Sequence, residues 1–127
     1  MLKILLVGIG GFAGSVSRYL LALAMYEYFA APAFPYATMV INIIGCFAIG
    51  VFNGVAESGG LFSVETRVLV VVGVLGGFTT FSAFGNETFV LLRDAQWFAA
   101  ISNVALHIVL GLAAVWLGYL TATAIWK

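Results

Sequence analysis

The sequence predicts an all-α integral membrane protein with four transmembrane helices, the third of which is interrupted. Of its 127 residues, 64% are hydrophobic and only 8% are charged, whereas soluble domains carry about 25% charged residues. A soluble fold of this size has too much surface to hide that apolar excess. The apolar residues instead form long stretches, and about 20 such residues cross the hydrocarbon core of a bilayer as a helix. We therefore expect the lipid bilayer to surround the whole chain.

The stretches form one transmembrane domain over residues 1–127. Prolines at Pro32 and Pro35 break the helix after the first stretch, and charged residues border the third, with Arg93 at its end. Lipid offers the backbone no hydrogen-bond partner, so each stretch must be helical. The expected spans are residues 2–29, 36–56, 64–92 and 96–126.

The composition excludes several classes of function. The formal net charge is zero and no basic run occurs, so the footprint of a nucleic-acid-binding protein is absent. The single cysteine, Cys46, cannot form an intrachain disulfide or a cysteine-based metal cluster. No nucleophile stands beside a base, and the lone His107 has no evident catalytic partner. We expect no enzyme.

Charge and glycine spacing bear on orientation and assembly. An even number of spans places Lys3, Arg67 and Lys127 on one side and Arg93 on the other, a weak positive-inside signal. Insertion in both orientations and one fixed orientation both remain open.

Glycine pairs at four-residue steps predict close helix packing, and they lie at positions 10 and 14, 50 and 54, and 73 and 77. So small a chain encloses little interior, so we expect a homodimer.

The third span contains the sequence GGFTTFSAF at residues 76–84. Glycine destabilises a helix interior by about 1 kcal/mol, and hydroxyl side chains such as those of Thr79 and Thr80 compete with the helical hydrogen bonds. A broken membrane helix exposes carbonyls that attract cations and amides that attract anions. An ion site is therefore predicted at the break. A kinked but continuous helix is the alternative.

Two further polar side chains lie within the predicted spans. Asn42, in the second span, either lines a pore or joins two helices by hydrogen bonds. Glu87, in the third, is a candidate functional group because burying its charge is unfavourable. It lies in an ion pathway or pairs with Arg18 of the first span, and both interpretations remain open.

Phe81 and Phe84 share nearly one helix face and could turn positive ring edges toward an anion, although core packing also explains them.

Three motifs together resemble the Fluc (CrcB) family of bacterial fluoride channels. They are GGFAGSVSRY at residues 10–19, TMVIN at residues 38–42 and GGFTTFSAF at residues 76–84. The resemblance implies an antiparallel, dual-topology homodimer in the bacterial inner membrane that lowers cytoplasmic fluoride by passive export. It also implies a structural sodium ion, not itself transported, at the dimer interface. The backbone carbonyls of Gly76 and Thr79 from both subunits would hold it.

The resemblance also implies roles for side chains. Asn42 would donate a hydrogen bond to fluoride, with Ser82 as a second candidate donor, and Phe81 and Phe84 would offer ring edges. Arg18 would lie near a vestibule or in an ion pair.

The sequence departs from the family in two places. Ala83 stands where Ser or Thr is frequent, and residues 108–120 of the fourth span contain no hydroxyl track, with Leu110 and Ala114 in the region where one is expected. Asn103 and His107, on one helix face, either supply polarity there or form hydrogen bonds between helices.

Two other functions compete. Small multidrug or guanidinium exporters have a similar size, but they resemble one another in a glutamate near the middle of the first span. This chain has Arg18 there and Glu27 only at the end. A non-transporting membrane assembly subunit would explain the glycine pairs, but not the third-span motif together with Asn42.

Overall fold

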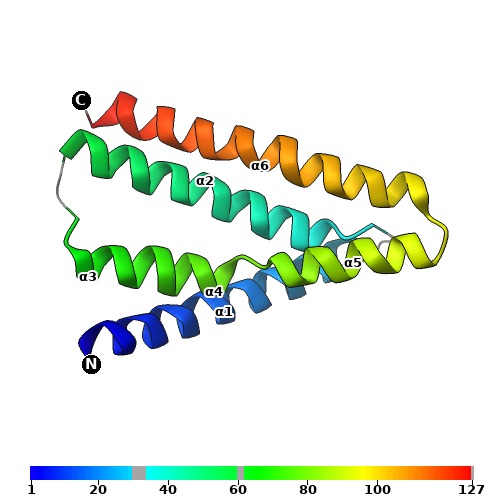
Figure 1. The fold of residues 1–127 in the computed structure, drawn as a ribbon, viewed down its shortest axis with the longest axis horizontal. Helices are drawn as coiled ribbons and strands as arrows, with labels where there is room; N and C mark the ends of the chain where they lie inside the picture. The colour runs from blue at the N-terminus through cyan, green and yellow to red at the C-terminus, as the bar shows by residue number, and fades with distance from the viewer. Residues whose placement is uncertain (30–33, 60–61, 127) are drawn as a thin grey trace.

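The computed structural model describes residues 1–29, 34–59 and 62–126, and the regular elements in these ranges are helices (Figure 1). Four helical stretches are long and apolar enough to cross a membrane, which confirms the predicted all-α membrane class. The predicted turn at Pro32 and the charge of Lys127 lie outside the described residues. The elements are α1 (Leu2–Phe29), α2 (Tyr36–Gly59), α3 (Val64–Arg67), the π-helical η1 (Val68–Leu75), α4 (Gly76–Phe78), α5 (Phe81–Arg93) and α6 (Trp97–Ile125).

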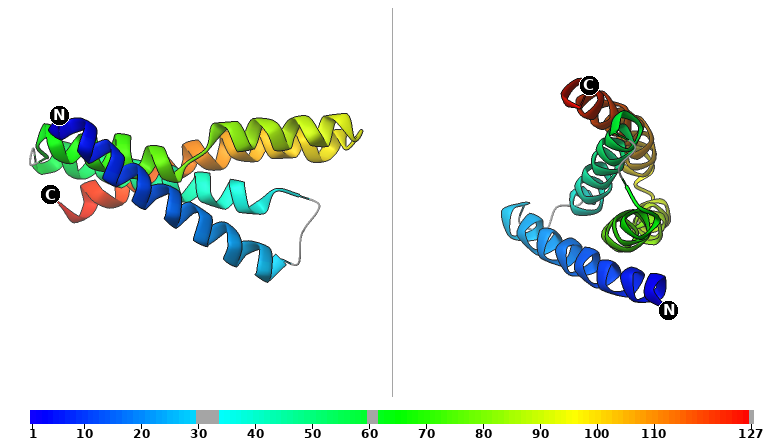
Figure 2. Two further views of the ribbon diagram at one scale, coloured as in Figure 1. Left: turned by 90° about the horizontal axis from the view of Figure 1, so that it is seen from below. Right: turned by 90° about the vertical axis from the view of Figure 1, so that its left-hand side faces the viewer.

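The helices form two main pairs. α2 packs chiefly against α6, and α1 packs chiefly against η1 and α4. Both termini lie at the same end of the molecule (Figure 1). At the opposite end, the hairpin of α5 and α6 extends away from the end of α1 and the start of α2 (Figure 2). The chain is therefore open at that end rather than closed into a four-helix bundle.

Glycine allows the helices of each pair to touch through their backbones. A Cβ atom at Gly14 of α1 would overlap the carbonyl oxygen of Val74 and would lie 2.8 Å from the amide nitrogen of Phe78. A Cβ at Gly50 of α2 would overlap the carbonyl oxygen of Val115 in α6. Side chains at these positions would push the helices apart, so small residues set the distance within each pair.

The buried core is thin and follows the contact of α2 with α6. It is made largely of small residues, among them Ala100 at 1% exposure and Ala122 at 0%. Large apolar side chains point outward instead, as shown by Phe12 at 74% and Trp116 at 63% exposure. Contiguous apolar surface of this kind requires a cover, which lipid or another protein chain supplies.

Candidate functional site

The third stretch changes direction at Thr79 and Thr80. α4 ends at Phe78 and α5 begins at Phe81, while Thr79 (φ −82°, ψ 160°) and Thr80 (φ −150°, ψ 110°) are extended. The amide and the hydroxyl of Thr79 both donate to the Leu75 carbonyl, at 3.0 and 2.9 Å. The hydroxyl oxygen of Thr80 accepts from the Ala83 amide at 3.2 Å and so caps α5. Threonine thus serves as the last helical donor of one half and as the cap of the next.

Asn42 of α2 holds the extended segment through two reciprocal hydrogen bonds. Its Oδ1 accepts from the Thr80 amide at 2.9 Å, and its Nδ2 donates to the Thr80 carbonyl at 3.2 Å. In a continuous helix the Thr80 amide would donate to the carbonyl of Gly76. Asn42 takes that donor, so the Gly76 carbonyl loses its helical partner. One N–H of the Asn42 amide is left for a further ligand.

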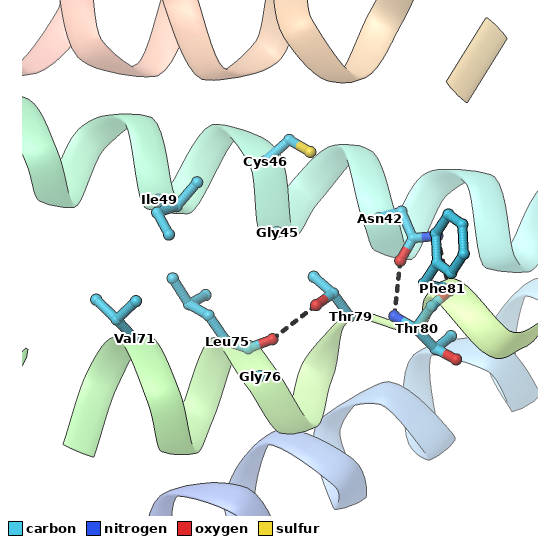
Figure 3. Close-up of a pocket in the computed structure, with 10 residues that line it drawn as sticks. All are labelled: Asn42, Gly45, Cys46, Ile49, Val71, Leu75, Gly76, Thr79, Thr80 and Phe81. Atoms are coloured by element: carbon cyan, nitrogen blue, oxygen red, sulfur yellow. Dashed lines mark hydrogen bonds between the residues drawn. The ribbon is translucent and has the colours of Figure 1, made fainter. Parts of the chain in front are cut away.

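An open groove of about 360 Å³ lies beside this segment. Figure 3 shows Asn42 and Thr80 at one end and apolar side chains along the rest. Gly76 and Thr79, the two predicted sodium ligands, both line the groove, as does Phe81. The groove combines polar backbone at one point with walls of Ile49, Val71 and Leu75, an arrangement typical of small-ligand sites.

The phenylalanines of the motif lie next to each other but have different surroundings. Their ring centroids are 5.6 Å apart with planes at 49°. Phe81 is 83% exposed in the single chain, whereas Phe84 packs against His107 of α6 at 4.4 Å between ring centroids. Ser82 is exposed, and its hydroxyl lies 3.3 Å from that of Thr80.

A second pocket, of about 320 Å³, lies between α1, α2 and α5 and also includes Thr80 in its lining. Arg18, Glu87 and Ala83 all line it. Among the described residues, Arg18 and Glu87 form no salt bridge with each other; the salt bridge found there joins Arg93 to Asp94. Glu87 instead accepts a hydrogen bond from the Thr38 hydroxyl. Sequence reasoning missed this partner, although Thr38 precedes Asn42 by one helical turn in the same motif and so shares its face.

Asn103 and His107 lie between α6 and α5. Asn103 is fully buried and donates to the Thr88 hydroxyl of α5 at 2.9 Å, so its side chain joins two helices. The Nδ1 atom of His107 lies 2.9 Å from the backbone carbonyl of Asn103, which is a contact within one helix. Thr88 was not singled out in the sequence, and its position one turn after Phe84 is the signal that could have identified it.

These features define a class of protein: a multi-pass membrane protein with a discontinuous helix whose break is held by an asparagine from a neighbouring helix. Comparison with known proteins specifies the family. Residues 5–119 match the family described as CrcB-like protein, Camphor Resistance (CrcB), and the chain belongs to this family. The sequence-based resemblance is thereby confirmed.

Curated relatives cover nearly the whole chain. A protein of Methylobacillus flagellatus is 44% identical over 94% of this chain and 93% of its own length. A protein of Shewanella sp. strain W3-18-1 is 43% identical over 93% of this chain and 94% of its own. A protein of Geobacter sulfurreducens is 43% identical over 96% of this chain and 98% of its own length. Each is named fluoride-specific ion channel FluC.

Proposed function

We propose that this chain is a fluoride-specific ion channel of the bacterial inner membrane that lowers cytoplasmic fluoride by passive export. The observation that carries the proposal is the Asn42-held break at Thr80, in a chain similar along nearly its whole length to relatives of that name. A broken helix at membrane depth presents hydrogen-bond donors and acceptors that an uninterrupted helix uses internally. Fluoride is small and strongly hydrated, and donors must replace its water for it to pass.

The functional unit in this proposal is an antiparallel homodimer with two fluoride pathways. The groove beside Thr79 and Thr80 is only partly enclosed in the single chain, and Phe81, which lines it, is 83% exposed. A second copy of the chain would cover both the groove and the exposed ring of Phe81. A lone chain with an open groove would leave the polar backbone of the break facing lipid, which is unfavourable.

A sodium ion at the centre of the dimer is the proposed cofactor, structural and not transported. The residues fit it: the Gly76 carbonyl has lost its helical donor to Asn42, Thr79 is extended, and both line the groove. Carbonyls at an unwound helix end are suitable ligands for a hard cation. When bound, the ion would neutralise the negative end of the half-helix that finishes at Phe78.

Sodium is expected to stabilise the purified dimer. A ligand that binds only the folded state adds about 2.7 kcal/mol to the free energy of unfolding at one hundred times its dissociation constant. The thermal midpoint in detergent should therefore be higher in sodium chloride than in choline chloride of equal ionic strength. Potassium chloride is the matched control for a small cation. Equal midpoints in all three salts would remove sodium from the proposal.

Side chains along the break supply the proposed fluoride pathway. Asn42 keeps one N–H for fluoride, and Ser82 adds a hydroxyl near Thr80. Phe81 and Phe84 offer their ring edges. Arg18 and Glu87 line the pocket between α1, α2 and α5. We assign this pocket to the vestibule, where the guanidinium attracts the anion and the carboxylate orders water.

Efflux from liposomes tests the function directly. Vesicles that contain the purified protein and a fluoride gradient should release fluoride rapidly after addition of a potassium ionophore. Vesicles loaded with chloride should show no comparable release. Guanidinium efflux driven by a proton gradient, without fluoride efflux, would favour the exporter. An inert protein in every assay would favour the assembly subunit.

The variants Phe81→Ile and Phe84→Ile are expected to reduce fluoride efflux while the dimer persists on size-exclusion chromatography. Aromatic edge interactions contribute about 1 kcal/mol, which corresponds to about fivefold in rate. Phe98→Ile is the matched control, because Phe98 is 86% exposed, much like Phe81, but lies at the start of α6. Efflux at the wild-type rate in both test variants would rule out the ring-edge role.

A further inference from the structure

A groove of about 330 Å³ lies between α1 and η1, near the N-terminal end of both elements. Its lining consists of one lysine and four apolar side chains, which are Lys3, Ile4 and Val7 of α1 and Val68 and Val72 of η1. The groove beside the break uses Val71 of η1 instead. Neighbouring residues of a helix project roughly a quarter of a turn apart, so the two grooves open on different sides of η1.

Glycine explains why this groove is not filled by side chains. A Cβ atom at Gly10 would lie 2.5 Å from the Leu69 carbonyl oxygen, and one at Gly73 would lie 2.9 Å from the Gly10 Cα atom. The backbones therefore touch, and the side chains beside the contact form the walls of a crevice. Gly8 lies one turn after Ile4 on the same face, and a Cβ there would meet no atom within 4 Å. The groove is thus open toward the middle of the membrane.

The depth of the groove in the bilayer follows from the length of α1. The helix has 28 residues, and about 20 residues cross the hydrocarbon core, so about four residues at each end lie in the headgroup layer. Lys3 is the second residue of α1, and its long side chain can place the ammonium group at the level of the lipid phosphates. Val7 lies one turn deeper, where the acyl chains begin.

The charges around the groove favour an anionic headgroup. Lys3 is exposed and forms no salt bridge with the residues that the structure describes. Arg67 and Glu65 belong to α3, which lies at the same end of the molecule as the N-terminus (Figure 1). Glu57 of α2 accepts a hydrogen bond from Tyr119 of α6. Glu65 offsets one of the two cations, so the elements that form the groove keep one net positive charge at this end.

We propose that the groove between α1 and η1 binds one anionic phospholipid of the surrounding bilayer. The Lys3 ammonium group binds the lipid phosphate, and one acyl chain lies between Val7 and Val72. Phosphatidylglycerol carries an uncompensated negative charge, whereas the phosphate of phosphatidylethanolamine has its own ammonium group beside it. The net positive charge at this end therefore selects phosphatidylglycerol. The lipid contacts both α1 and η1 and so strengthens the contact between them.

Lipid retention by the purified protein tests the headgroup preference. The protein is equilibrated in micelles that contain equal amounts of phosphatidylglycerol and phosphatidylethanolamine, and the lipids that remain bound after size-exclusion chromatography are quantified by mass spectrometry. One basic side chain near an anionic lipid corresponds to about fivefold in binding, so phosphatidylglycerol should be retained in about fivefold excess. Lys3→Gln should lower this ratio to about one. Lys3→Arg, the matched control, should keep it.

A larger side chain in the groove tests the position of the acyl chain. Val72→Trp should reduce the retained amount of both lipids, because the indole occupies the space of the chain. Val109→Trp is the matched control, since Val109 of α6 is 63% exposed and Val72 is 56% exposed. It should retain the wild-type amounts. If Val72→Trp instead separated the dimer on size-exclusion chromatography, the groove would be an interface between two copies, and the lipid assignment would be overturned.

A measurement on the unaltered protein does not depend on a variant that folds. Salt screens exposed charges, so the excess of phosphatidylglycerol should approach one in about 1 M potassium chloride. A wild-type ratio of one at low salt, or a ratio that neither salt nor Lys3→Gln changes, would overturn the proposal. These experiments measure lipid binding alone, so their outcome is independent of whether the protein conducts fluoride.

Discussion

Fluoride efflux is expected to fall by more than tenfold when Asn42 is replaced by alanine. The variant removes the hydrogen bonds that Asn42 makes to the amide and to the carbonyl of Thr80. An unsatisfied buried polar group destabilises the folded state by about 1–3 kcal/mol. The Thr80 amide is then free to donate to the Gly76 carbonyl and to restore a continuous helix. That rearrangement would remove the open carbonyl at the break as well as the remaining donor of Asn42. Liposome efflux, normalised to the amount of folded dimer, measures the effect.

Asn53→Ala is the matched control for Asn42→Ala. Asn53 lies on the same helix but is exposed, so its loss leaves the break untouched and efflux should stay at the wild-type rate. A variant at Asn42 that lowers the thermal midpoint but conducts normally per folded dimer would contradict the proposal. Asn42 would then only join two helices, which is the alternative that its sequence position left open.

The largest expected effect on stability follows from Gly14→Ala. Its new Cβ would overlap the Val74 carbonyl and approach the Phe78 amide to 2.8 Å. Backbone atoms cannot rotate aside, so α1 must move away from η1 and α4. Overpacking of this kind destabilises by about 1–3 kcal/mol or more. Because Phe78 immediately precedes the extended segment, fluoride efflux should fall together with the free energy of unfolding, measured by denaturation in detergent micelles.

Gly8→Ala provides the comparison on the same helix. A Cβ at Gly8 meets no atom within 4 Å, and alanine is favoured over glycine in a helix interior by about 1 kcal/mol. Its stability should therefore equal or exceed that of the wild type. If Gly14→Ala were as stable as Gly8→Ala, the close backbone contact between α1 and the third stretch would be refuted.

The class of fold was predictable because lipid restricts the chain so strongly. Long apolar stretches with few charges admit only helices, and residues 76–84 carry glycines and threonines in an unusual density. The sequence also singled out Asn42 as a polar side chain in need of a partner. These inferences depend on composition and on neighbours along the chain, which the sequence displays directly.

Which side chains become hydrogen-bond partners depends on how the helices pack against one another. Thr79 and Thr80 were expected to compete with the helix on their own, yet Thr80 is held by Asn42, 38 residues earlier in the chain. Glu87 was equally compatible with Arg18, and its contact with Thr38 follows from the packing of α5 beside α2. The rotation of each helix about its axis decides such pairs, and no local pattern in one sequence specifies it.

The backbone contact of α1 with η1 has a mechanical consequence. At Gly14 the two helices meet without an intervening side chain, so no rotamer change there can absorb a relative displacement of the helices. Sliding would require breaking the fit of the two backbones at once, and α1 and η1 should therefore move as one rigid body. The hairpin of α5 and α6 extends beyond that body (Figure 2) and is joined to it through the extended residues Thr79 and Thr80. Asn42 of α2 holds Thr80 by two hydrogen bonds, and α6 packs along α2, so this junction is fixed to the neighbouring helices and is no free hinge.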